Sequence, residues 1–458
     1  MAPRLGLGGG VSADPASGLF AGGIPDATND WNFALNQRSD SALNSVDDIT
    51  FSRGSVGWVM NDAGNLVEVA SGEPRYGYDT SDNSLGLLME RASTNLMWYS
   101  DLSSNMIAFE SNGIDRSSNT TTGPDGVSGS GYSINTVAGT KYHITYVSTE
   151  LTTADLDDAD ERCYSIYAKA GNADYLRMGF TLNFVGATTQ VGASFDLTSG
   201  SVDKQERCTA YTENVGNGWY RCVVHSTNMP ATDGNHYRGP FFSPSNTALA
   251  YESPDNVIVE SRDEGGANEH VFLWGMNIEG RVGLVDRTFP TSFIETGGGT
   301  ATRVIDQATA STSDWGWSAT EGSMLIELER TNTADASGDM GIFKITGGSG
   351  NDLTFDTSTT EENFQIVSGA GAGGTAVMDA GDDVAPNTPY KIAAGWKAND
   401  VAVTLNGATS VTDTSFTLAD VFSGDPITLG GSYFSGFIKR VRYWDTKLTN
   451  EQLEELST

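Results

Sequence analysis

The chain has 458 residues, of which 26 are Lys or Arg and 59 are Asp or Glu, giving a formal net charge of −33. Such an excess of carboxylates argues against partners that carry phosphate, so we expect no nucleic acid and no docking on anionic lipid. Glycine is abundant at 54 residues and aromatic residues make up 10%, which excludes a disordered chain and favours an all-β protein with many turns.

Residues 1–48 are predicted to form an extended arm, because glycine interrupts every stretch that would otherwise favour a helix. The run Leu5–Gly10 does not fit a phosphate-binding loop, since four residues precede it and Pro15 follows soon after. The start also lacks the apolar core of a signal peptide, so we expect synthesis in the cytoplasm. The arm is expected to be ordered only where it lies on a partner.

Residues 49–105 are predicted to form a connector that contains a β-hairpin. Strand-like runs at 51–60 and 65–70 flank the turn sequence Asn61-Asp-Ala-Gly64. The apolar side chains of this zone are too few for a core of their own, so we expect them to pack on a neighbouring domain or chain.

Residues 106–300 are predicted to form a first β-sandwich. Apolar residues alternate along 175–182 and along 270–278, where Phe272, Trp274, Met276 and Ile278 are expected to share one face. Short turns without a helical period between the strands indicate two packed antiparallel sheets. Three cysteines without a CxxC pair are expected to be free thiols in the core, namely Cys163, Cys208 and Cys222.

Residues 301–458 are predicted to form a second sandwich, which makes the fold all-β with two antiparallel β-sandwich (jelly-roll) domains. In 323–329 the apolar residues alternate with Glu327 and Glu329, which are expected to point outward. The pair Asn406-Gly407 favours a type I′ hairpin turn after the strand 401–405. A helix is expected over 450–456, capped by Thr449 or Asn450.

Four strings within residues 50–303 stand out. They are Pro74-Arg75 with Tyr78-Asp79, Gly86-Leu-Leu-Met-Glu-Arg-Ala-Ser-Thr-Asn-Leu96, Gly216-Asn-Gly-Trp-Tyr-Arg-Cys222, and Phe289-Pro-Thr-Ser-Phe-Ile-Glu-Thr296 with Thr302-Arg303. These strings resemble segments of tailed-phage virion proteins and occur in the same order. Such proteins are tail fibres, head-spike fibres or minor structural proteins, so the resemblance implies a virion component, with a homotrimer as the expected assembly. The resemblance does not specify a position on the particle.

The C-terminal part contains four segments in a familiar order, Val401–Gly407, Ile427–Gly431, Gly436–Trp444 and Leu448–Leu453. In this order they resemble a laminin-G or concanavalin-A-like jelly roll. The resemblance implies a lectin-like or a purely structural sandwich and identifies no ligand. Residues 106–300 are expected to be similar to a carbohydrate-binding module.

Catalytic chemistry has little support in the sequence. Enzymes that cut polysaccharides on this jelly roll carry paired carboxylates in a Glu-x-Asp-x-x-Glu pattern, which is absent here. Glu327 and Glu329 alternate on one strand, but that strand is interpreted as an edge or solvent face. The four histidines have no metal or triad spacing. We therefore expect that the chain is not an enzyme.

Two further clusters are candidates for ligand binding, each with a plainer alternative. Asp155, Asp157 and Asp158 lie in an acidic run that either holds Ca2+ or forms a solvated loop without a metal, and no other cofactor is expected. Trp315 and Trp317 either form an aromatic platform for a sugar ring or pack in the core.

One basic cluster remains, at 439–442 in a strand. Its members are expected to pair with carboxylates of the same chain, or else to form salt bridges between subunits. They are Lys439, Arg440 and Arg442.

These observations predict a fibre- or spike-like virion component, anchored by its N-terminus through Leu5, Leu7 and Phe20. The expected partners are other virion proteins, further copies of the chain and host surface polysaccharide, without membrane insertion. One alternative is a passive head or tail decoration protein without a ligand. Another is a polysaccharide-active enzyme.

Overall fold

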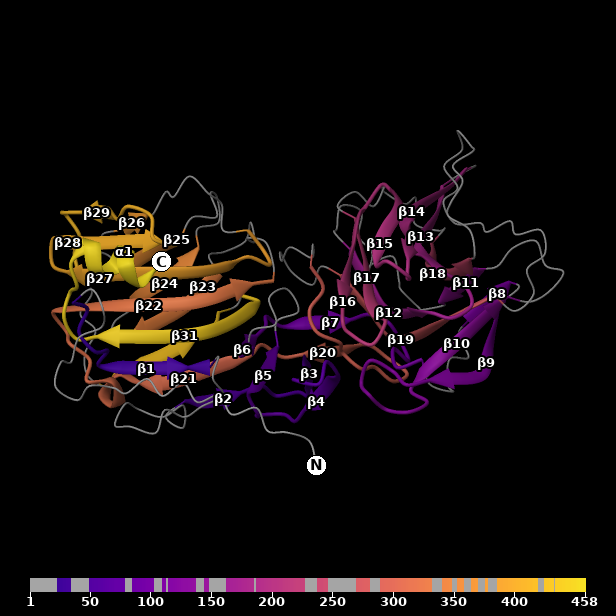
Figure 1. Cartoon of the computed structure of the whole chain (residues 1–458), viewed down its shortest axis with the longest axis horizontal. Helices are drawn as coiled ribbons and strands as arrows, with labels where there is room; N and C mark the ends of the chain where they lie inside the picture. Colours follow the sequence, from indigo (N-terminus) through magenta and orange to yellow (C-terminus); the bar gives the residue numbers. More distant parts are fainter. Residues whose placement is uncertain are drawn as a thin grey trace, which may run out of the picture.

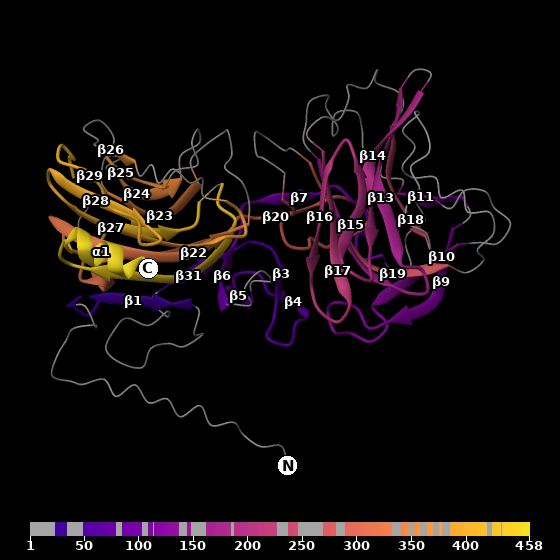
Figure 2. The same ribbon diagram turned by 45° about the horizontal axis from the view of Figure 1, so that its top comes forward.

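A computed structural model shows two β-sandwiches side by side, which we call the N-terminal and C-terminal lobes (Figure 1). The view turned by 45° shows the same two lobes, with a small hairpin between them (Figure 2). This architecture confirms the predicted all-β fold class. The structure describes residues 23–33, 49–78, 85–102, 109–112, 114–136, 144–147, 162–184, 187–226, 237–245, 269–280, 289–331, 340–347, 352–357, 364–369, 375–377, 385–418, 424–431 and 433–458.

The N-terminal lobe consists of two antiparallel sheets that enclose an apolar core. Leu176, Met178 and Ile278 are completely buried in this core, as the alternation predicts. The first sheet runs β16 (Thr209–Asn214), β17 (Trp219–Ser226), β12 (Arg162–Ala170), β19 (His270–Gly280), β10 (Gly131–Thr136), β9 (Ile114–Thr121), with β7 (Ser93–Asn95) joining β19 to β20 (Ala301–Arg303). The second runs β15 (Ser201–Glu206), β14 (Ala187–Asp196), β13 (Tyr175–Phe184), β18 (Tyr237–Ser245), β11 (Ile144–Val147), β8 (Phe109–Asn112).

The C-terminal lobe also has two antiparallel sheets around one core. The first runs β29 (Val411–Asp413), β28 (Asp400–Leu405), β27 (Pro389–Lys397), β22 (Glu321–Arg330), β31 (Gly436–Trp444), β6 (Leu85–Met89), β5 (Arg75–Tyr78), and β1 (Asn29–Asn32) also pairs with β31. The second runs β2 (Thr50–Ser52), β21 (Gln307–Ser311), β30 (Pro426–Leu429), β23 (Met340–Thr346), β24 (Asp352–Thr357), β25 (Phe364–Ser368), β26 (Thr375–Val377).

Two local predictions in this lobe are confirmed. Asn406 and Gly407 both have positive φ, as a type I′ turn requires. The helix α1 (Asn450–Leu456) is capped by Thr449, whose hydroxyl accepts from the Gln452 amide while the Gln452 side chain accepts from the Thr449 amide. This reciprocal capping box places Leu453 in a small core under the first sheet.

The C-terminal lobe is assembled from both ends of the chain. β1, β2, β5 and β6 precede the N-terminal lobe in sequence, yet they join the C-terminal sheets. The predicted arm therefore differs from expectation, because its residues 29–32 form a strand on the chain itself. The reason is β31: one part of its free edge pairs with β6 and the next part pairs with β1, which satisfies its backbone groups.

A β-bulge at Gly275 overturns the prediction that residues 272–278 share one face. Ile166 pairs with Met276 while Tyr167 pairs with Trp274, so Gly275 is an extra residue with φ of 47°. Met276 and Ile278 point into the N-terminal core, whereas Trp274 and Phe272 point to the opposite face. The bulge therefore turns Trp274 toward the junction with the C-terminal lobe.

Other expectations can be checked on the described residues. The three cysteines are free thiols, two buried and Cys208 half-buried. Among the helices in the described part of the chain, none is long and apolar enough to cross a membrane.

Candidate functional site between the lobes

A small hairpin forms a wedge between the two lobes. Its strands are β3 (Gly57–Met60) and β4 (Leu66–Val69), which confirms the predicted hairpin and its turn at 61–64. Because side chains alternate along a strand, Trp58 and Met60 pack on the N-terminal lobe while Val59 packs on Leu88 and Phe437. The expectation that this zone packs on a neighbouring domain is borne out on both of its faces.

Beside the wedge lies a buried cluster of charged side chains, which we call the hub: Arg53, Arg75, Glu90, Arg303 and Asp306. Arg75 occupies its centre, donating to Glu90 Oε2 at 2.5 Å and forming a second ion pair with Asp306. Arg303 Nη1 lies 3.0 Å from Glu90 Oε2, and Arg53 Nη1 lies 3.1 Å from Asp306 Oδ1. All five residues are less than 5% exposed, so each charge depends on its partners.

Backbone groups tie the hub to both lobes. Ser292, which leads out of the N-terminal lobe, donates from its amide to Glu90 Oε1 and from its hydroxyl to Oε2, both at 2.7 Å. Arg53 donates to the carbonyls of Val69 and Ala70 in the wedge. The hub therefore joins the N-terminal lobe, the wedge and the C-terminal lobe in one hydrogen-bonded unit.

The electrostatics of the hub keep Glu90 ionised. Burial by itself would raise the pKa of this carboxyl, but Arg303, Arg75 and the two hydrogen bonds from Ser292 outweigh burial and lower the pKa to about 2. Asp306 contributes a second carboxylate, and the charge of Glu279 acts on Arg303 from further away. The hub thus contains three guanidinium groups and two carboxylates, with the negative charge of Glu279 nearby.

The strings that resemble virion proteins converge on this junction. Arg75, Glu90, Ser292 and Arg303 come from three of these strings, with Ser292 and Arg303 in the same one, and all of them take part in the hub or bind it. Asn95, in the same string as Glu90, is also fully buried. Its side-chain amide makes five hydrogen bonds, which join β7, β19 and residue 294. The resembling residues therefore have a structural role in this chain.

The string at 216–222 takes part as well. Trp219 is completely buried and donates from Nε1 to the Thr122 carbonyl at 3.1 Å. Arg221 donates to the Thr291 carbonyl at 2.5 Å and to the Ser165 hydroxyl at 3.1 Å. It thereby fixes the segment that carries Ser292 against β17.

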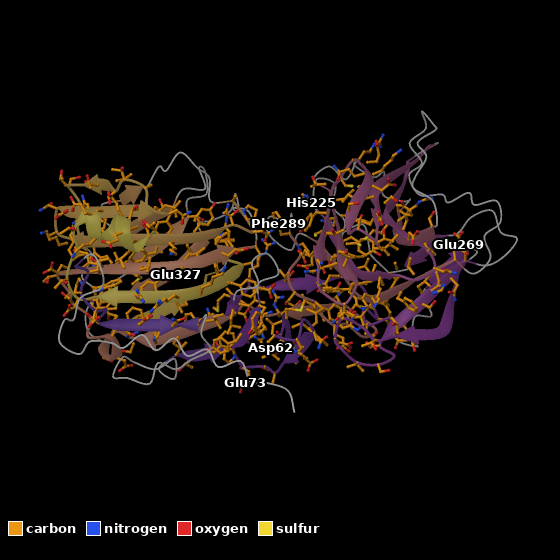
Figure 3. The ribbon with its side chains drawn as sticks, viewed as in Figure 1. Asp62, Glu73, His225, Glu269, Phe289 and Glu327 are labelled. Carbon is orange, nitrogen blue, oxygen red and sulfur yellow. The ribbon has the colours of Figure 1, made fainter. Side chains whose placement is uncertain are left out.

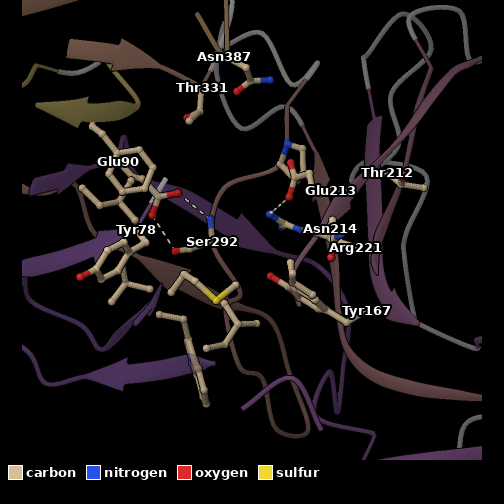
Figure 4. Close-up of a pocket in the computed structure, with 18 of the residues that line it drawn as sticks. Tyr78, Glu90, Tyr167, Thr212, Glu213, Asn214, Arg221, Ser292, Thr331 and Asn387 are labelled. Carbon is tan, nitrogen blue, oxygen red and sulfur yellow. Dashed lines mark hydrogen bonds and ion pairs between the residues drawn. The ribbon is translucent and has the colours of Figure 1, made fainter. Parts of the chain in front are cut away.

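A pocket of about 320 Å³ opens between the lobes next to the hub, and we call it the interlobe pocket. Figure 4 shows Arg221 and Glu213 facing it from the N-terminal lobe, with Glu90 and Ser292 on the opposite side and Thr331 and Asn387 at its rim. Phe289, which contacts Tyr211 with ring centroids 5.8 Å apart, also lies between the lobes (Figure 3). Other lining residues are Trp58, Tyr78, Tyr167, Tyr211, Asn214 and Phe437.

The charges in the pocket are constrained by their neighbours. Glu213 Oε2 lies 3.6 Å from Arg221 Nη1, and the Arg221 guanidinium lies over the Tyr167 ring at 5.4 Å from its centroid. Glu90 is held by the hub. Burial would lower the pKa of Arg221, but Tyr167, Glu213 and Glu279 outweigh it and raise that pKa, so this side chain remains a cation.

The sequence did not point to this pocket. Its polar residues Tyr211, Glu213 and Asn214 lie on β16, a half-exposed strand directly before the Gly216–Gly218 turn. The available signal was an aromatic and polar run outside the apolar alternation, but that pattern is also typical of any sheet edge. Only the packing of the two lobes brings these residues opposite Thr331 and Asn387.

The structure corrects the predicted aromatic platform. Trp315 and Trp317 are only 1% and 8% exposed, so their rings are not open to a sugar. Trp317 stacks on Tyr443 with ring centroids 4.8 Å apart, and Trp315 packs edge-on against Trp31 at 4.2 Å. The reason is that η4 (Thr312–Trp315) turns both indoles into the C-terminal core, which was the plainer alternative.

The predicted outward position of Glu329 is also wrong. β22 is a central strand between β27 and β31, and Glu329 is completely buried with Lys439 Nζ 3.2 Å from its Oε2. Glu327 is half-buried on the same strand (Figure 3). The pair therefore does not form an open catalytic dyad.

The basic cluster pairs within the chain, as one of its two interpretations expected. Arg440 forms an ion pair with Asp30 of β1, and Arg442 Nε lies 3.3 Å from the same carboxylate. Lys439 pairs with Glu329. Asp30 thus fixes the N-terminal strand on β31 by charge as well as by backbone pairing.

The other predicted site residues lie outside the described residues. These are the acidic run with Asp155, Asp157 and Asp158 and the anchoring residues Leu5, Leu7 and Phe20. Within the described ranges, no group of three His, Cys, Asp or Glu side chains gathers as a metal site.

Comparisons with known proteins give no family. No family model matches the chain, and no curated protein matches it. Among solved structures, domain 4 of the arabinanase AbnA from Geobacillus stearothermophilus, in complex with arabinotriose, is similar at 15% identity and a TM-score of 0.29, covering 35% of this chain and 77% of that one.

Two further structures are similar over a comparable share. The CBM40 of the Ruminococcus gnavus IT-sialidase, bound to alpha2,3 sialyllactose, matches at 15% identity and a TM-score of 0.27, covering 31% of this chain and 84% of that one. A heptameric SAP-like pentraxin from Limulus polyphemus matches at 10% identity and a TM-score of 0.25, covering 31% and 70%.

Proposed function

We propose that this chain is a structural component of a tailed-phage particle, fibre- or spike-like, in which the hub holds two sandwiches as one body. The observation that supports the proposal is the convergence of the resembling strings. Residues 75, 90, 292 and 303 are far apart in sequence and meet in a single buried unit. A resemblance that includes three of the five hub residues and Ser292 beside them supports a common architecture more strongly than scattered matches do.

The test is to purify particles of the phage whose genome encodes this chain. Mass spectrometry of the particles and immunogold labelling with an antibody against the C-terminal lobe should both detect the chain on them. Its absence from intact particles, together with its presence in the infected-cell lysate, would contradict the proposal.

Anchoring by the N-terminus is part of the proposal, and the structure sharpens its test. A truncation of residues 1–22 leaves β1 on β31, so it removes the predicted anchor without removing a strand of the C-terminal lobe. We expect the truncated chain to fold and to be missing from particles. Incorporation at the level of the full chain would rule out this anchor.

The finer part of the proposal is weak binding of host surface glycan, strengthened by many copies on one particle. The competing function is passive decoration of the head or tail without a ligand. Binding of the intact assembly to host envelope polysaccharide distinguishes them, since a decoration protein should not bind. Release of reducing sugar from that polysaccharide would instead favour the enzyme alternative, which has no open carboxylate pair at Glu327 and Glu329 to support it.

A further inference from the structure

We propose that the interlobe pocket binds an uncharged sugar residue. This inference deepens the glycan-binding part of the proposed function by naming a site and a class of ligand. The volume of about 320 Å³ lies at the lower end of the range for small-molecule sites, about 300–1,000 Å³. A ligand of one or two rings fits that size better than a longer chain.

The first argument is the set of polar atoms without partners. Trp58 Nε1, Tyr211 Oη and Arg221 Nε are buried and make no hydrogen bond to any described residue. All three residues line the pocket, and Arg221 is only 5% exposed. Because a buried polar group without a partner is costly, three of them around one pocket indicate that a bound molecule supplies the missing hydrogen bonds.

The second argument is the charge of the lining. Its ionised groups are Glu90, Glu213 and Arg221, which sum to −1 in a chain of −33. Glu90 is neutralised by the hub, and Arg221 already faces Glu213 at 3.6 Å. Among the described lining residues an anionic ligand would find no cation without a carboxylate partner, and it would meet the acidic field of the chain, so we expect the ligand to be uncharged.

The third argument is the mixture of aromatic and hydrogen-bonding groups. Tyr78 and Tyr211, which are half-buried, offer ring surfaces, while Asn214 and Asn387 offer amides that both donate and accept. A sugar ring presents an apolar C–H face and a rim of hydroxyl groups that donate and accept. It therefore matches the lining better than a purely apolar ligand does.

The test uses the full chain and saturation-transfer NMR with glucose, galactose and N-acetylglucosamine as probes, and glucuronic acid as the charged comparison. We expect millimolar binding of at least one uncharged sugar and weaker binding of glucuronic acid. Absence of binding by all three uncharged sugars would overturn the inference, as would tighter binding of glucuronic acid. The virion role is tested separately on particles and survives either result.

Two substitutions locate the binding. Tyr211→Phe removes the unpartnered hydroxyl from the N-terminal lobe, and Thr331→Val removes a hydroxyl from the C-terminal rim without changing the side-chain shape. Each substitution should raise the dissociation constant of the sugar about tenfold, which corresponds to the loss of one hydrogen bond of about 1.4 kcal/mol. Tyr175→Phe, which removes a tyrosine hydroxyl elsewhere on the N-terminal lobe, should leave binding unchanged.

Thermal unfolding controls for folding in each variant. If the melting temperatures match and neither Tyr211→Phe nor Thr331→Val weakens binding, the sugar binds elsewhere and the inference is wrong. If only one variant folds, that variant alone decides the outcome.

Discussion

At Glu90 one carboxylate accepts from two arginines and from both polar hydrogens of Ser292. This buried carboxylate compensates the positive charges of Arg75 and Arg303, which are themselves buried. Arg75 and Arg303 are each at most 1% exposed, so water cannot replace the carboxylate. The stability of the junction therefore depends on Glu90, which pairs with Arg303 and shares Arg75 with Asp306.

The substitution Glu90→Gln tests that dependence. It keeps the side-chain shape but removes the carboxylate that pairs with Arg303 and one of the two that pair with Arg75. Leaving a buried charge without its partner typically costs about 3–5 kcal/mol. We expect a clearly lower melting temperature by calorimetry. Glu455→Gln, on the exposed face of α1, is the matched control and should change stability by less than about 0.5 kcal/mol. Equal melting temperatures for the two variants would contradict the role of Glu90.

Acid should weaken the same contacts. The pKa of Glu90 is lowered from 4.5 in the unfolded chain to about 2 in the fold, so its stabilising effect is complete above pH 4.5 and is lost as the pH falls toward 2. The shift corresponds to roughly 3 kcal/mol. Urea unfolding across this pH range should show that the free energy of unfolding of the natural chain exceeds that of Glu90→Gln by less and less as the pH falls. A constant difference between the two would mean that Glu90 is not the titrating group.

At the scale of elements, β1 completes the C-terminal lobe. Trp31 is 1% exposed and packs on Trp315, while Asp30 pairs with Arg440 and Arg442. The strand thus contributes a core side chain and an ion pair as well as its backbone hydrogen bonds. It belongs to the fold of the C-terminal lobe even though it comes from the opposite end of the sequence.

Trp31→Ala should destabilise this lobe by about 3–5 kcal/mol, because it leaves a cavity beside Trp315. Hydrogen exchange should show faster exchange in β31 and β22, with the N-terminal lobe much less affected. Val127→Ala, at a residue that is 57% exposed, is the control. Unchanged protection of β31 in Trp31→Ala would argue against the contribution of β1.

Some of the helices, strands and turns could be predicted from the sequence, and others could not. The alternation along 175–182, the Asn406-Gly407 turn and the capped helix are local patterns. The structure confirms the turn, the helix and the alternation at the side chains that it describes there, Leu176 and Met178. The alternation of 272–278 failed because one inserted residue, Gly275, reverses the faces without disturbing the composition. Glu329 was misplaced for a related reason, since alternation does not tell a central strand from an edge.

The hub and the interlobe pocket lay beyond sequence reasoning for another reason. Arg75 meets Asp306 across 231 positions, and Glu90 meets Ser292 across 202. Such pairs have no local periodicity or spacing, so a single sequence contains no signal that joins them. The resembling strings identified several of the participating residues but not their contact.

At the scale of the whole molecule, the wedge and the hub couple two cores. Val59 packs on the C-terminal lobe while Trp58, its neighbour, packs on Trp274 and Phe293 of the other side. Because neighbouring side chains of the wedge pack on opposite lobes, we expect the two lobes to unfold together.

Calorimetry of the natural chain should therefore give one cooperative transition. Val59→Asp places a charge in the small apolar cluster with Leu88 and Phe437, and we expect it to split unfolding into two transitions, one for each lobe. Val127→Asp, on an exposed loop, should keep a single transition. Two transitions in the natural chain would contradict the proposed coupling.

The discontinuous C-terminal lobe sets an order of events during synthesis. The strands of the N-terminal lobe lie within residues 93–303, so this lobe has all its parts soon after Arg303 leaves the ribosome. β1 must wait for β31, since Asn29 pairs with Tyr443 across more than 400 residues. Trp31 of β1 and the following Phe33 therefore stay without their final partners during nearly all of translation. We expect this long exposure to favour aggregation and completion of the C-terminal lobe to be slower than folding of the N-terminal lobe.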